Sequence, residues 1–187
     1  RLPRYRQGNR RLSQSLNSYN ISMPILDANT FEFISRSADQ TRRAGLRLGN
    51  LLQPGDLIGL IGDLGAGKTT LMQGITSGWG SLDQVTSPTF VLVNVYRRPN
   101  QERLFHLDTY RLNSSAEARD LDIDSMLEDS ALVIEWAEKI QEILPQNRLW
   151  IEIKWVDENQ RDFLITAYGS RYLNLLAEFR RQLFGVA

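Results

Sequence analysis

The feature that most constrains this chain is the run Gly62-Asp63-Leu64-Gly65-Ala66-Gly67-Lys68-Thr69, which matches G-x-x-x-x-G-K-[ST] at every fixed position. An apolar segment, residues 57–61, leads into it, and an amphipathic segment, residues 68–79, follows it. Three glycines let the backbone bend so that successive N–H groups face one anion. The N-terminus of the following helix adds the positive end of its dipole. The sequence therefore predicts a phosphate-binding loop between a strand and a helix.

This loop predicts nucleotide binding with defined roles for its residues. The Lys68 ammonium is expected to reach the β- and γ-phosphates, and the Thr69 hydroxyl is expected to bind Mg²⁺. A chance glycine turn before a helix is the competing interpretation, and the agreement of strand, loop and helix disfavours it. The loop residues expected to contact the nucleotide are Asp63, Leu64, Gly65, Ala66, Gly67, Lys68, Thr69 and Thr70.

Composition narrows the remaining possibilities. The chain has 187 residues, which is typical of one domain, and 42% of them are hydrophobic, which is enough for a core. Cysteine is absent and His106 is the single histidine, so thiol catalysis and zinc–thiolate sites are excluded. No apolar run approaches the length of a membrane helix, and we expect no membrane partner. The formal net charge of zero argues against a globally basic nucleic-acid binder.

The charge is concentrated at the N-terminus. Residues 1–26 carry five arginines and no acidic residue, which leaves 17 basic and 22 acidic residues, a net charge of −5, in residues 27–187. We predict a disordered extension over 1–26 and one nucleotide-binding domain over 27–187. The extension has three interpretations: an organellar targeting peptide, an RNA-contacting arm, or an upstream extension of a reading frame whose functional start lies near Met23. We favour the third.

Periodicity predicts an α/β fold. Helices are expected at residues 37–52, 68–79 and 171–184, and a capping box at Ser114 and Glu117 predicts a short helix there. Strands are expected at residues 57–61, 90–96, 103–107, 132–134, 150–153 and 163–167, with a hairpin turn at residues 99–100. This mixture of βα units and a hairpin predicts an α/β sheet that is partly parallel and partly antiparallel.

Two acidic residues are candidates for holding Mg²⁺ and orienting an attacking water. Glu135 ends the apolar run 132–134, and Asp108 follows the strand expected at 103–107. Acids at the carboxyl ends of strands lie on the ligand-binding edge of an open sheet. The alternative for either residue is a surface acid or a helix cap, and the sequence does not fix which of the two is the base and which is the metal ligand.

Three further positions are weaker candidates. Thr89, in the segment Ser87-Pro88-Thr89-Phe90, stands where nucleotide switches place a threonine, although a simple turn explains the segment as well. His106 lies inside an apolar strand, where a hydrogen-bonded structural role is more common than catalysis. Trp136 is a candidate contact for a base or a partner, but most tryptophans belong to a core.

Four segments occur in an order that carries a family resemblance. They are Gly62 to Thr70, Ser87-Pro88-Thr89-Phe90, His106-Leu107-Asp108-Thr109-Tyr110-Arg111-Leu112, and Ile134-Glu135-Trp136-Ala137-Glu138-Lys139. Together they resemble the TsaE family, also called YjeE, over residues 30–170. The fold that this resemblance implies is an α/β P-loop NTPase three-layer sandwich with a mixed, partly antiparallel sheet. No N-K-x-D motif for guanine or LSGGQ-like segment is present, which disfavours Ras-like GTPases and transporter ATPases.

The resemblance implies a function. It implies a small Mg²⁺-dependent ATPase that supports formation of threonylcarbamoyladenosine at the tRNA base 3′ of the anticodon. The implied partners are the TsaD and TsaB proteins, with tRNA met only through their complex. The implied location is the cytoplasm, with an organellar role for the arginine-rich extension left open. Two alternatives remain open: a small-molecule P-loop kinase, and an assembly factor that binds ATP without hydrolysing it.

The resemblance also implies roles for individual residues. Thr69 and Glu135 carry over to the metal site, Asp108 is a further acid that serves the metal or the water, and these two acids act with Lys68 in catalysis. Thr89 and Trp136 stand near the nucleotide or a partner. Thr41 is expected to approach the adenine, and the segment from Asn159 to Arg161 is expected to close over the nucleotide from the other side.

Overall fold

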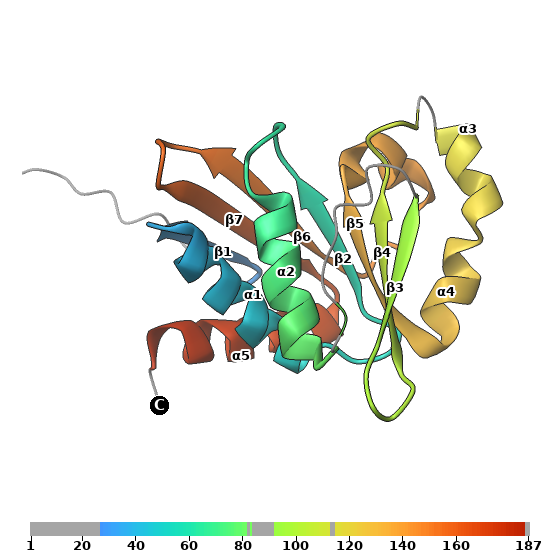
Figure 1. Cartoon of the computed structure of the whole chain (residues 1–187), viewed down its shortest axis with the longest axis horizontal. Coiled ribbons are helices and arrows are strands. Elements are labelled where there is room, and N and C mark those ends of the chain that lie inside the picture. The colour runs from blue at the N-terminus through green and yellow to red at the C-terminus, as the bar shows by residue number, and fades with distance from the viewer. Residues whose placement is uncertain (1–26, 82, 84–91, 113–114, 186–187) are drawn as a thin grey trace, which may run out of the picture.

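The computed structural model describes residues 27–81, 83, 92–112 and 115–185. Within them lies a seven-stranded mixed sheet in the order β1-β7-β6-β2-β5-β4-β3 (Figure 1). Its strands are β1 (Thr30–Ser35), β2 (Leu57–Ile61), β3 (Val93–Arg97), β4 (Arg103–Asp108), β5 (Ser130–Glu135), β6 (Arg148–Trp155) and β7 (Arg161–Tyr168). Strand β2 pairs in parallel with β5 and β6, and β4 pairs in parallel with β5. The outer pairs are antiparallel, so the predicted mixed sheet is confirmed.

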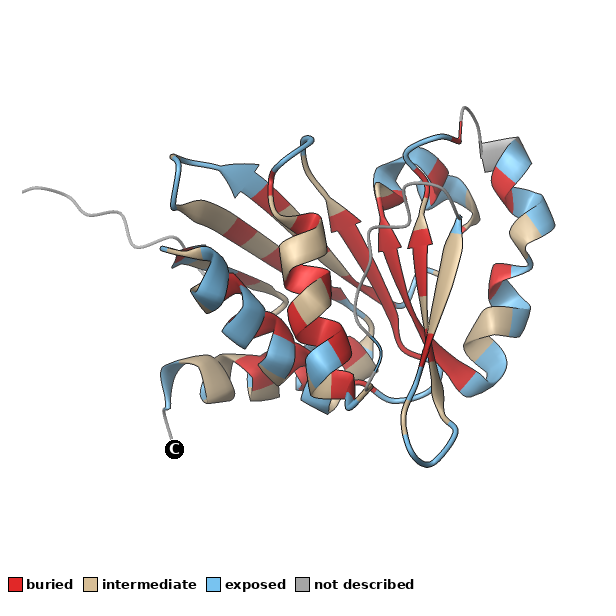
Figure 2. Cartoon of the chain, viewed as in Figure 1, coloured by how far each residue is buried: buried red, intermediate tan, exposed pale blue. Residues whose placement is uncertain are grey.

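Helices cover both faces of the sheet and make three layers. One face carries α1 (Ala38–Leu51), α2 (Lys68–Trp79) and α5 (Ser170–Phe184), which pack over side chains such as Ile58 and Ile151. The other face carries α3 (Ser115–Ala118), the 3₁₀ turn η1 (Arg119–Leu121), α4 (Ile123–Asp129) and the 3₁₀ segment η2 (Ala137–Ile143). These elements pack over Leu57, Leu132 and Ile134. The central strands are therefore almost wholly buried (Figure 2), as apolar parallel strands must be.

Helices α1 and α2 approach unusually closely because glycines line their contact. A Cβ atom built on Gly49 would lie 2.1 Å from the Ile75 carbonyl oxygen, and one on Gly74 would lie 2.2 Å from that of Arg42. Any side chain would push the two backbones apart. The contact fixes α2, and with it the phosphate loop at the start of α2, against the rest of the domain.

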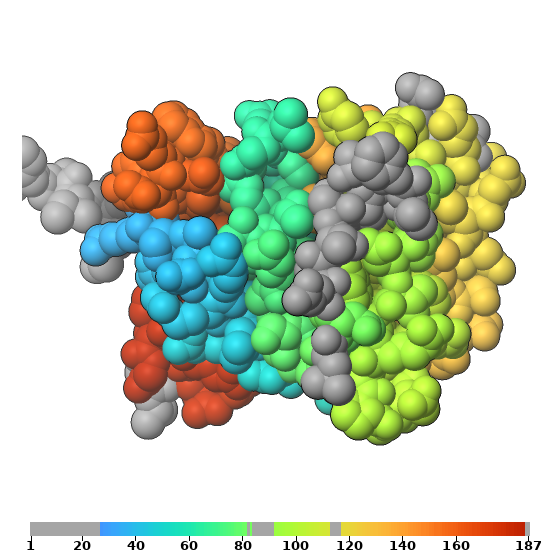
Figure 3. Space-filling model, viewed as in Figure 1, coloured from blue at the N-terminus to red at the C-terminus, as the bar shows by residue number. Residues whose placement is uncertain are grey.

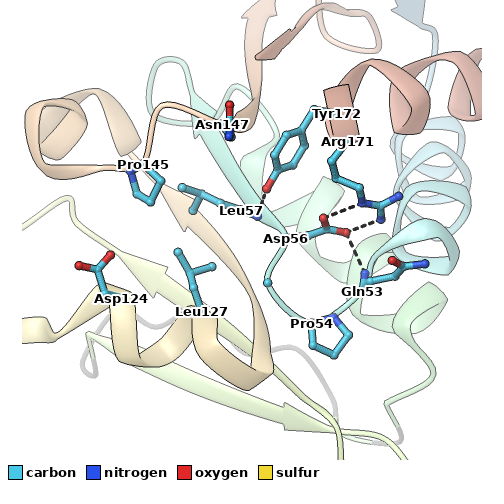
Figure 4. A pocket seen from close by; sticks show the side chains of 11 residues that line it. Gln53, Pro54, Asp56, Leu57, Asp124, Leu127, Pro145, Asn147, Arg171 and Tyr172 are labelled. Atoms are coloured by element: carbon cyan, nitrogen blue, oxygen red, sulfur yellow. Dashed lines mark hydrogen bonds and ion pairs between the residues drawn. The ribbon is translucent and has the colours of Figure 1, made fainter. Parts of the chain in front are cut away.

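An ion pair between Arg171 and the buried carboxylate of Asp56 fastens α5 to the turn that leads into β2 (Figure 4). The Arg171 guanidinium donates to both oxygens of the Asp56 carboxylate, at 3.0 and 2.6 Å, and the backbone N–H of Gln53 donates to the same carboxylate at 2.8 Å. The Leu57 N–H donates to the Tyr172 hydroxyl at 2.7 Å. These hydrogen bonds satisfy the Asp56 carboxylate. We therefore assign a structural role to the residues that line the adjacent pocket of about 480 Å³.

Most predicted elements are confirmed, with shifted ends. The helices at 37–52, 68–79 and 171–184 and the strands at 57–61 and 103–107 agree to within one or two residues. Of the strand predicted at 90–96, residues 93–96 lie in β3 and Leu92 does not, while residues 90 and 91 lie outside the described residues. Ser114 of the predicted capping box lies outside them as well. The sequence analysis missed β1 and α4 altogether.

The helix contact generates a stability prediction. Replacing Gly49 with alanine should lower the free energy of unfolding by about 2 kcal/mol, the usual scale of overpacking, despite alanine's better helix propensity. The neighbouring exposed position gives a matched control, and Asn50→Ala should change stability by less than about 0.5 kcal/mol. Urea denaturation of both variants is the measurement, and equal midpoints would contradict the close contact.

Candidate functional site

The phosphate loop is shaped by three glycines with positive φ. The φ angles are 134° at Gly62, 79° at Gly65 and 111° at Gly67, which residues with a Cβ rarely adopt. Gly62 is also sterically required, because a Cβ there would lie 2.2 Å from the Ile153 carbonyl oxygen on β6. The loop reaches the surface at one edge of the sheet (Figure 3), and Leu64 at its tip is 81% exposed.

The loop ends at the N-terminus of α2, where backbone donors are available to an anion. Gly67 caps the helix without a side-chain hydrogen bond, and its carbonyl accepts the first helical bond from Leu71 N–H at 3.0 Å. The N–H groups of the first turn have no carbonyl partner inside the helix. With the helix dipole they form an anion-binding end of the kind that phosphate groups occupy.

The Lys68 ammonium is turned inward over the loop. Its Nζ donates to the carbonyl oxygens of Gly62 at 2.6 Å and Asp63 at 2.9 Å, and it lies 3.7 Å from the ring centroid of Trp136. Burial lowers the pKa of Lys68 from its ordinary value, while the nearby carboxylates, that of Glu135 foremost, act in the opposite direction. A phosphate in the loop would therefore meet a partly desolvated cation.

Glu135 is the buried acid of the site and ends β5. The Thr69 hydroxyl lies 3.3 Å from its Oε1 and 3.4 Å from its Oε2, and the Nε2 atom of His106 lies 3.0 Å from its Oε1. The residue is only 3% exposed. The first residue of α2 that can offer a hydroxyl to a metal therefore faces a carboxylate from the neighbouring strand.

Asp108 lies beside Glu135 at the same sheet edge. The two residues are paired in the register of β4 and β5. The Asp108 Oδ1 accepts a hydrogen bond from the Tyr110 N–H at 2.9 Å, which turns the chain away from the strand. The residue is half-buried, and its negative charge acts to raise the pKa of Lys68.

Thr109 joins the segment that follows β4 to the segment that follows β5. Its hydroxyl donates to the carbonyl oxygens of Glu135 at 3.0 Å and Trp136 at 2.7 Å, and its N–H donates to Glu135 O at 3.1 Å. Trp136 adopts a left-handed conformation with φ of 59°, and its ring lies 5.0 Å from that of Tyr110. Lys139 donates from Nζ to the Tyr110 carbonyl and stabilises the same turn. The two segments therefore form one unit.

The structure brings most predicted residues together. The loop residues, Asp108, Glu135 and Trp136 share one edge of the sheet, and Arg161 at the start of β7 lies over the loop. The Arg161 Cγ and Nε atoms are 3.9 Å from the position of a Cβ on Gly67, while Nη1 donates to the Asp157 and Gln160 carbonyls.

The remaining two predicted residues are Thr41 and Thr89. Thr41 lies in the first turn of α1 with 2% exposure, and its hydroxyl is hydrogen-bonded to that of Ser35 at 2.8 Å. The Thr41 hydroxyl therefore links the start of α1 to the end of β1. Thr89 lies outside the described residues.

The hydrogen bonds that His106 and Thr109 make to Glu135 were not predicted from the sequence. His106 was predicted to be a hydrogen-bonded residue inside a strand, and its burial and its hydrogen bond agree, but its partner was not predicted. Thr109 belonged to a quoted motif and was given no role. One available signal was spacing: residues 106 and 108 point to the same face of β4, because side chains alternate along a strand. The parallel pairing that brings that face to Glu135 is not visible in the sequence.

The oxygen donors at this edge fit a magnesium ion. Mg²⁺ prefers oxygen ligands and is usually bound by one or two protein carboxylates or hydroxyls, with waters and substrate phosphates completing its shell. The Thr69 hydroxyl and the Glu135 carboxylate supply such a pair next to the phosphate loop. Within the described part of the chain, His, Asp and Glu side chains form no cluster of three or more that could hold a metal ion.

The fold and this loop define an α/β protein of the P-loop NTPase-like class. A family model described as "Threonylcarbamoyl adenosine biosynthesis protein TsaE" matches residues 35–163, more than half of the chain, so the chain belongs to the TsaE family.

Relatives and a solved structure agree with this assignment. The TsaE protein of Bacillus subtilis is 41% identical over 69% of this chain and 80% of its own length. That of Streptomyces coelicolor is 42% identical over 70% and 93%, and that of a Nostoc species is 33% identical over 84% and 98%. The crystal structure of Bacillus subtilis YdiB superposes with a TM-score of 0.68 at 32% identity, covering 82% of this chain and 95% of that one.

None of the helices in the described residues is long and apolar enough to cross a membrane.

The contact between Lys68 and Trp136 generates a spectroscopic prediction. Phosphates in the loop compete for the Lys68 ammonium, so ATP should change the fluorescence of Trp136 by altering the charge over its ring. Stopped-flow fluorescence of the wild-type chain should show a saturable change with ATP. Trp136→Phe should remove most of it, whereas Trp155→Phe, at an exposed position on β6, should retain it. A signal that survives Trp136→Phe would contradict the predicted contact.

Proposed function

We propose that this chain is a Mg²⁺-dependent ATPase that supports threonylcarbamoyladenosine formation on tRNA, in the cytoplasm, through a nucleotide-driven cycle with TsaD and TsaB. The observation that carries the proposal is the Thr69–Glu135 contact beside a complete phosphate loop. Membership of the TsaE family supports the role in tRNA modification. Phosphoryl transfer needs a phosphate-binding loop and acidic residues beside it, and both lie at this edge of the sheet.

In this proposal the loop residues 62–70 bind the phosphates through backbone N–H groups. Lys68 leaves the Gly62 and Asp63 carbonyls for the β- and γ-phosphate oxygens. Arg161, already over Gly67, lies where a guanidinium can cover the bound nucleotide. The desolvated surroundings of Lys68 strengthen its interaction with phosphate, since charge interactions grow as water is excluded.

The two acids take different roles. Glu135 would hold Mg²⁺ together with the Thr69 hydroxyl, because its carboxylate faces that hydroxyl. The ion would neutralise charge that develops on the phosphate oxygens. Asp108 has an oxygen free of the Tyr110 N–H bond, and we assign it to orienting the attacking water. The sequence left this choice open, and the contacts around Glu135 favour this division.

Hydrolysis would act on partners through the unit formed by residues 108–112 and 135–139. Thr109 and Lys139 couple the two segments, so a change at Asp108 or Glu135 moves both. Tyr110, half exposed at this edge, would present that change to TsaD and TsaB. A cycle of this kind uses ATP to switch a surface, and the RNA base is modified by the partner proteins.

Three substitutions test the roles. Lys68→Met should abolish ATP binding, because the loop loses its cation. Glu135→Gln and Asp108→Asn should keep ATP affinity within a few-fold and lower turnover by roughly 10²-fold or more, the usual cost of one preorganised group. Calorimetric ATP binding and phosphate release are the measurements. Glu142→Gln, on the exposed side of η2, is the matched control and should behave as wild type.

The outcomes separate the competing functions. Normal hydrolysis by both acid variants would contradict the assigned roles. Transfer of phosphate to an added metabolite in place of water would indicate a small-molecule kinase. Tight ATP binding without turnover by the wild-type chain, alone and with partners, would indicate an assembly factor.

A further inference from the structure

His106 is a fully buried histidine whose main polar contact is the site carboxylate. It lies in the middle of β4 with no exposed surface, and its Nε2 is 3.0 Å from Glu135 Oε1. A carboxylate accepts hydrogen bonds, so Nε2 carries the hydrogen and donates it. The imidazole is therefore a directed donor to one of the two oxygens that face Thr69.

The other ring nitrogen, Nδ1, makes no hydrogen bond to any residue that the structure describes. The atom is nevertheless buried. The ring stacks beside that of Tyr96, with centroids 6.2 Å apart and planes 26° apart. Leaving a buried polar atom unpaired is unfavourable for stability. An apolar residue would fill this core position without that cost, so the histidine is better explained by what it does to Glu135.

The bond to His106 restricts the Glu135 carboxylate. Its Oε1 is shared between the Nε2–H of His106 and the Thr69 hydroxyl, whereas among the described residues its Oε2 meets only the Thr69 hydroxyl. The His106 hydrogen bond therefore holds Oε1, while Oε2 faces the Thr69 hydroxyl at the start of α2. Hydrogen bonds of this kind to metal-ligating carboxylates orient them, and removing them commonly costs 10- to 100-fold in metal affinity.

We propose that His106 is a positioning residue that holds Glu135 in the orientation that binds the nucleotide-associated metal. The inference rests on the Mg²⁺–nucleotide function proposed above. It assigns to the histidine a role in metal affinity and none in the binding of the nucleotide itself, which the loop and Lys68 perform.

The test measures metal binding by the chain of residues 1–187, produced without a histidine tag. His106→Phe keeps a ring in the core but removes the donor. The affinity of the ADP complex for Mn²⁺, measured by electron paramagnetic resonance, should fall by 10- to 100-fold. ADP affinity in the presence of a chelator should change less than 2-fold. His106→Gln, whose amide can donate, should recover part of the Mn²⁺ affinity.

A neighbouring variant controls for disturbance of the core. Tyr96→Phe alters the ring beside His106 without removing the donor to Glu135, and it should bind Mn²⁺ as wild type does. Wild-type Mn²⁺ affinity in folded His106→Phe would overturn the proposal, as would equal losses in His106→Phe and Tyr96→Phe. Failure of the wild-type chain to bind Mn²⁺–ADP would instead overturn the proposed function, and this inference with it.

A second measurement needs no variant. Because His106 is the only histidine of the chain, its ring signals in a ¹⁵N NMR spectrum are assigned without ambiguity. We expect the Nε2-protonated form in the ADP complex, and a shift of the Nε2 resonance when Mg²⁺ is added. An unchanged resonance on saturation with Mg²⁺ would overturn the proposal even if His106→Phe did not fold.

Discussion

The parallel pairing of three central strands is the constraint on which the site depends. The register of β2 with β5 places Leu60 beside Glu135, and the register of β5 with β4 places Asp108 beside Glu135. Since parallel strands end at the same edge, the loop that follows β2 and both acids must converge there. The close α1–α2 contact and the Asp56–Arg171 ion pair act at a distance to hold that arrangement.

The polar groups of the site are buried but connected. Lys68, Glu135, His106 and Thr109 are each buried, and each makes at least one hydrogen bond within the site. A buried charge is tolerated only when it is paired or hydrogen-bonded, and here the loop carbonyls and the histidine provide those bonds. The same network supplies the directed donors and the desolvation that favour phosphate and metal. Stability and proposed function therefore draw on the same contacts.

Much of this fold was predictable from the sequence because its signals are local. The glycine pattern determines the loop, and apolar runs with helical or alternating periods determine most of the elements around it. Strand β1, TFEFIS, was missed because it is an edge strand with mixed burial, which gives a weak alternating pattern. Helix α4, IDSMLED, has few apolar residues and buries mainly Ile123, so its helical period is faint.

In the site, too, local patterns predict some residues, and other contacts depend on long-range pairing. Lys68 and Thr69 follow from a contiguous motif, and Glu135 follows from its place after an apolar run. The contact between His106 and Glu135 joins residues that are 29 positions apart in the sequence. It can be predicted only if β4 and β5 are known to be parallel neighbours. The engagement of Thr41 with Ser35 depends on how β1 enters α1, and β1 itself was not predicted. Long-range pairing is what the local patterns do not contain.

The central claim is that this site hydrolyses ATP and that the partner proteins govern the rate. The most direct test measures phosphate release from ATP by the purified chain with Mg²⁺, alone and with an active TsaD–TsaB pair. We predict slow release by the chain alone and a clear increase when the pair is added. ATP that stays bound but intact, with no change on adding the pair, would contradict it.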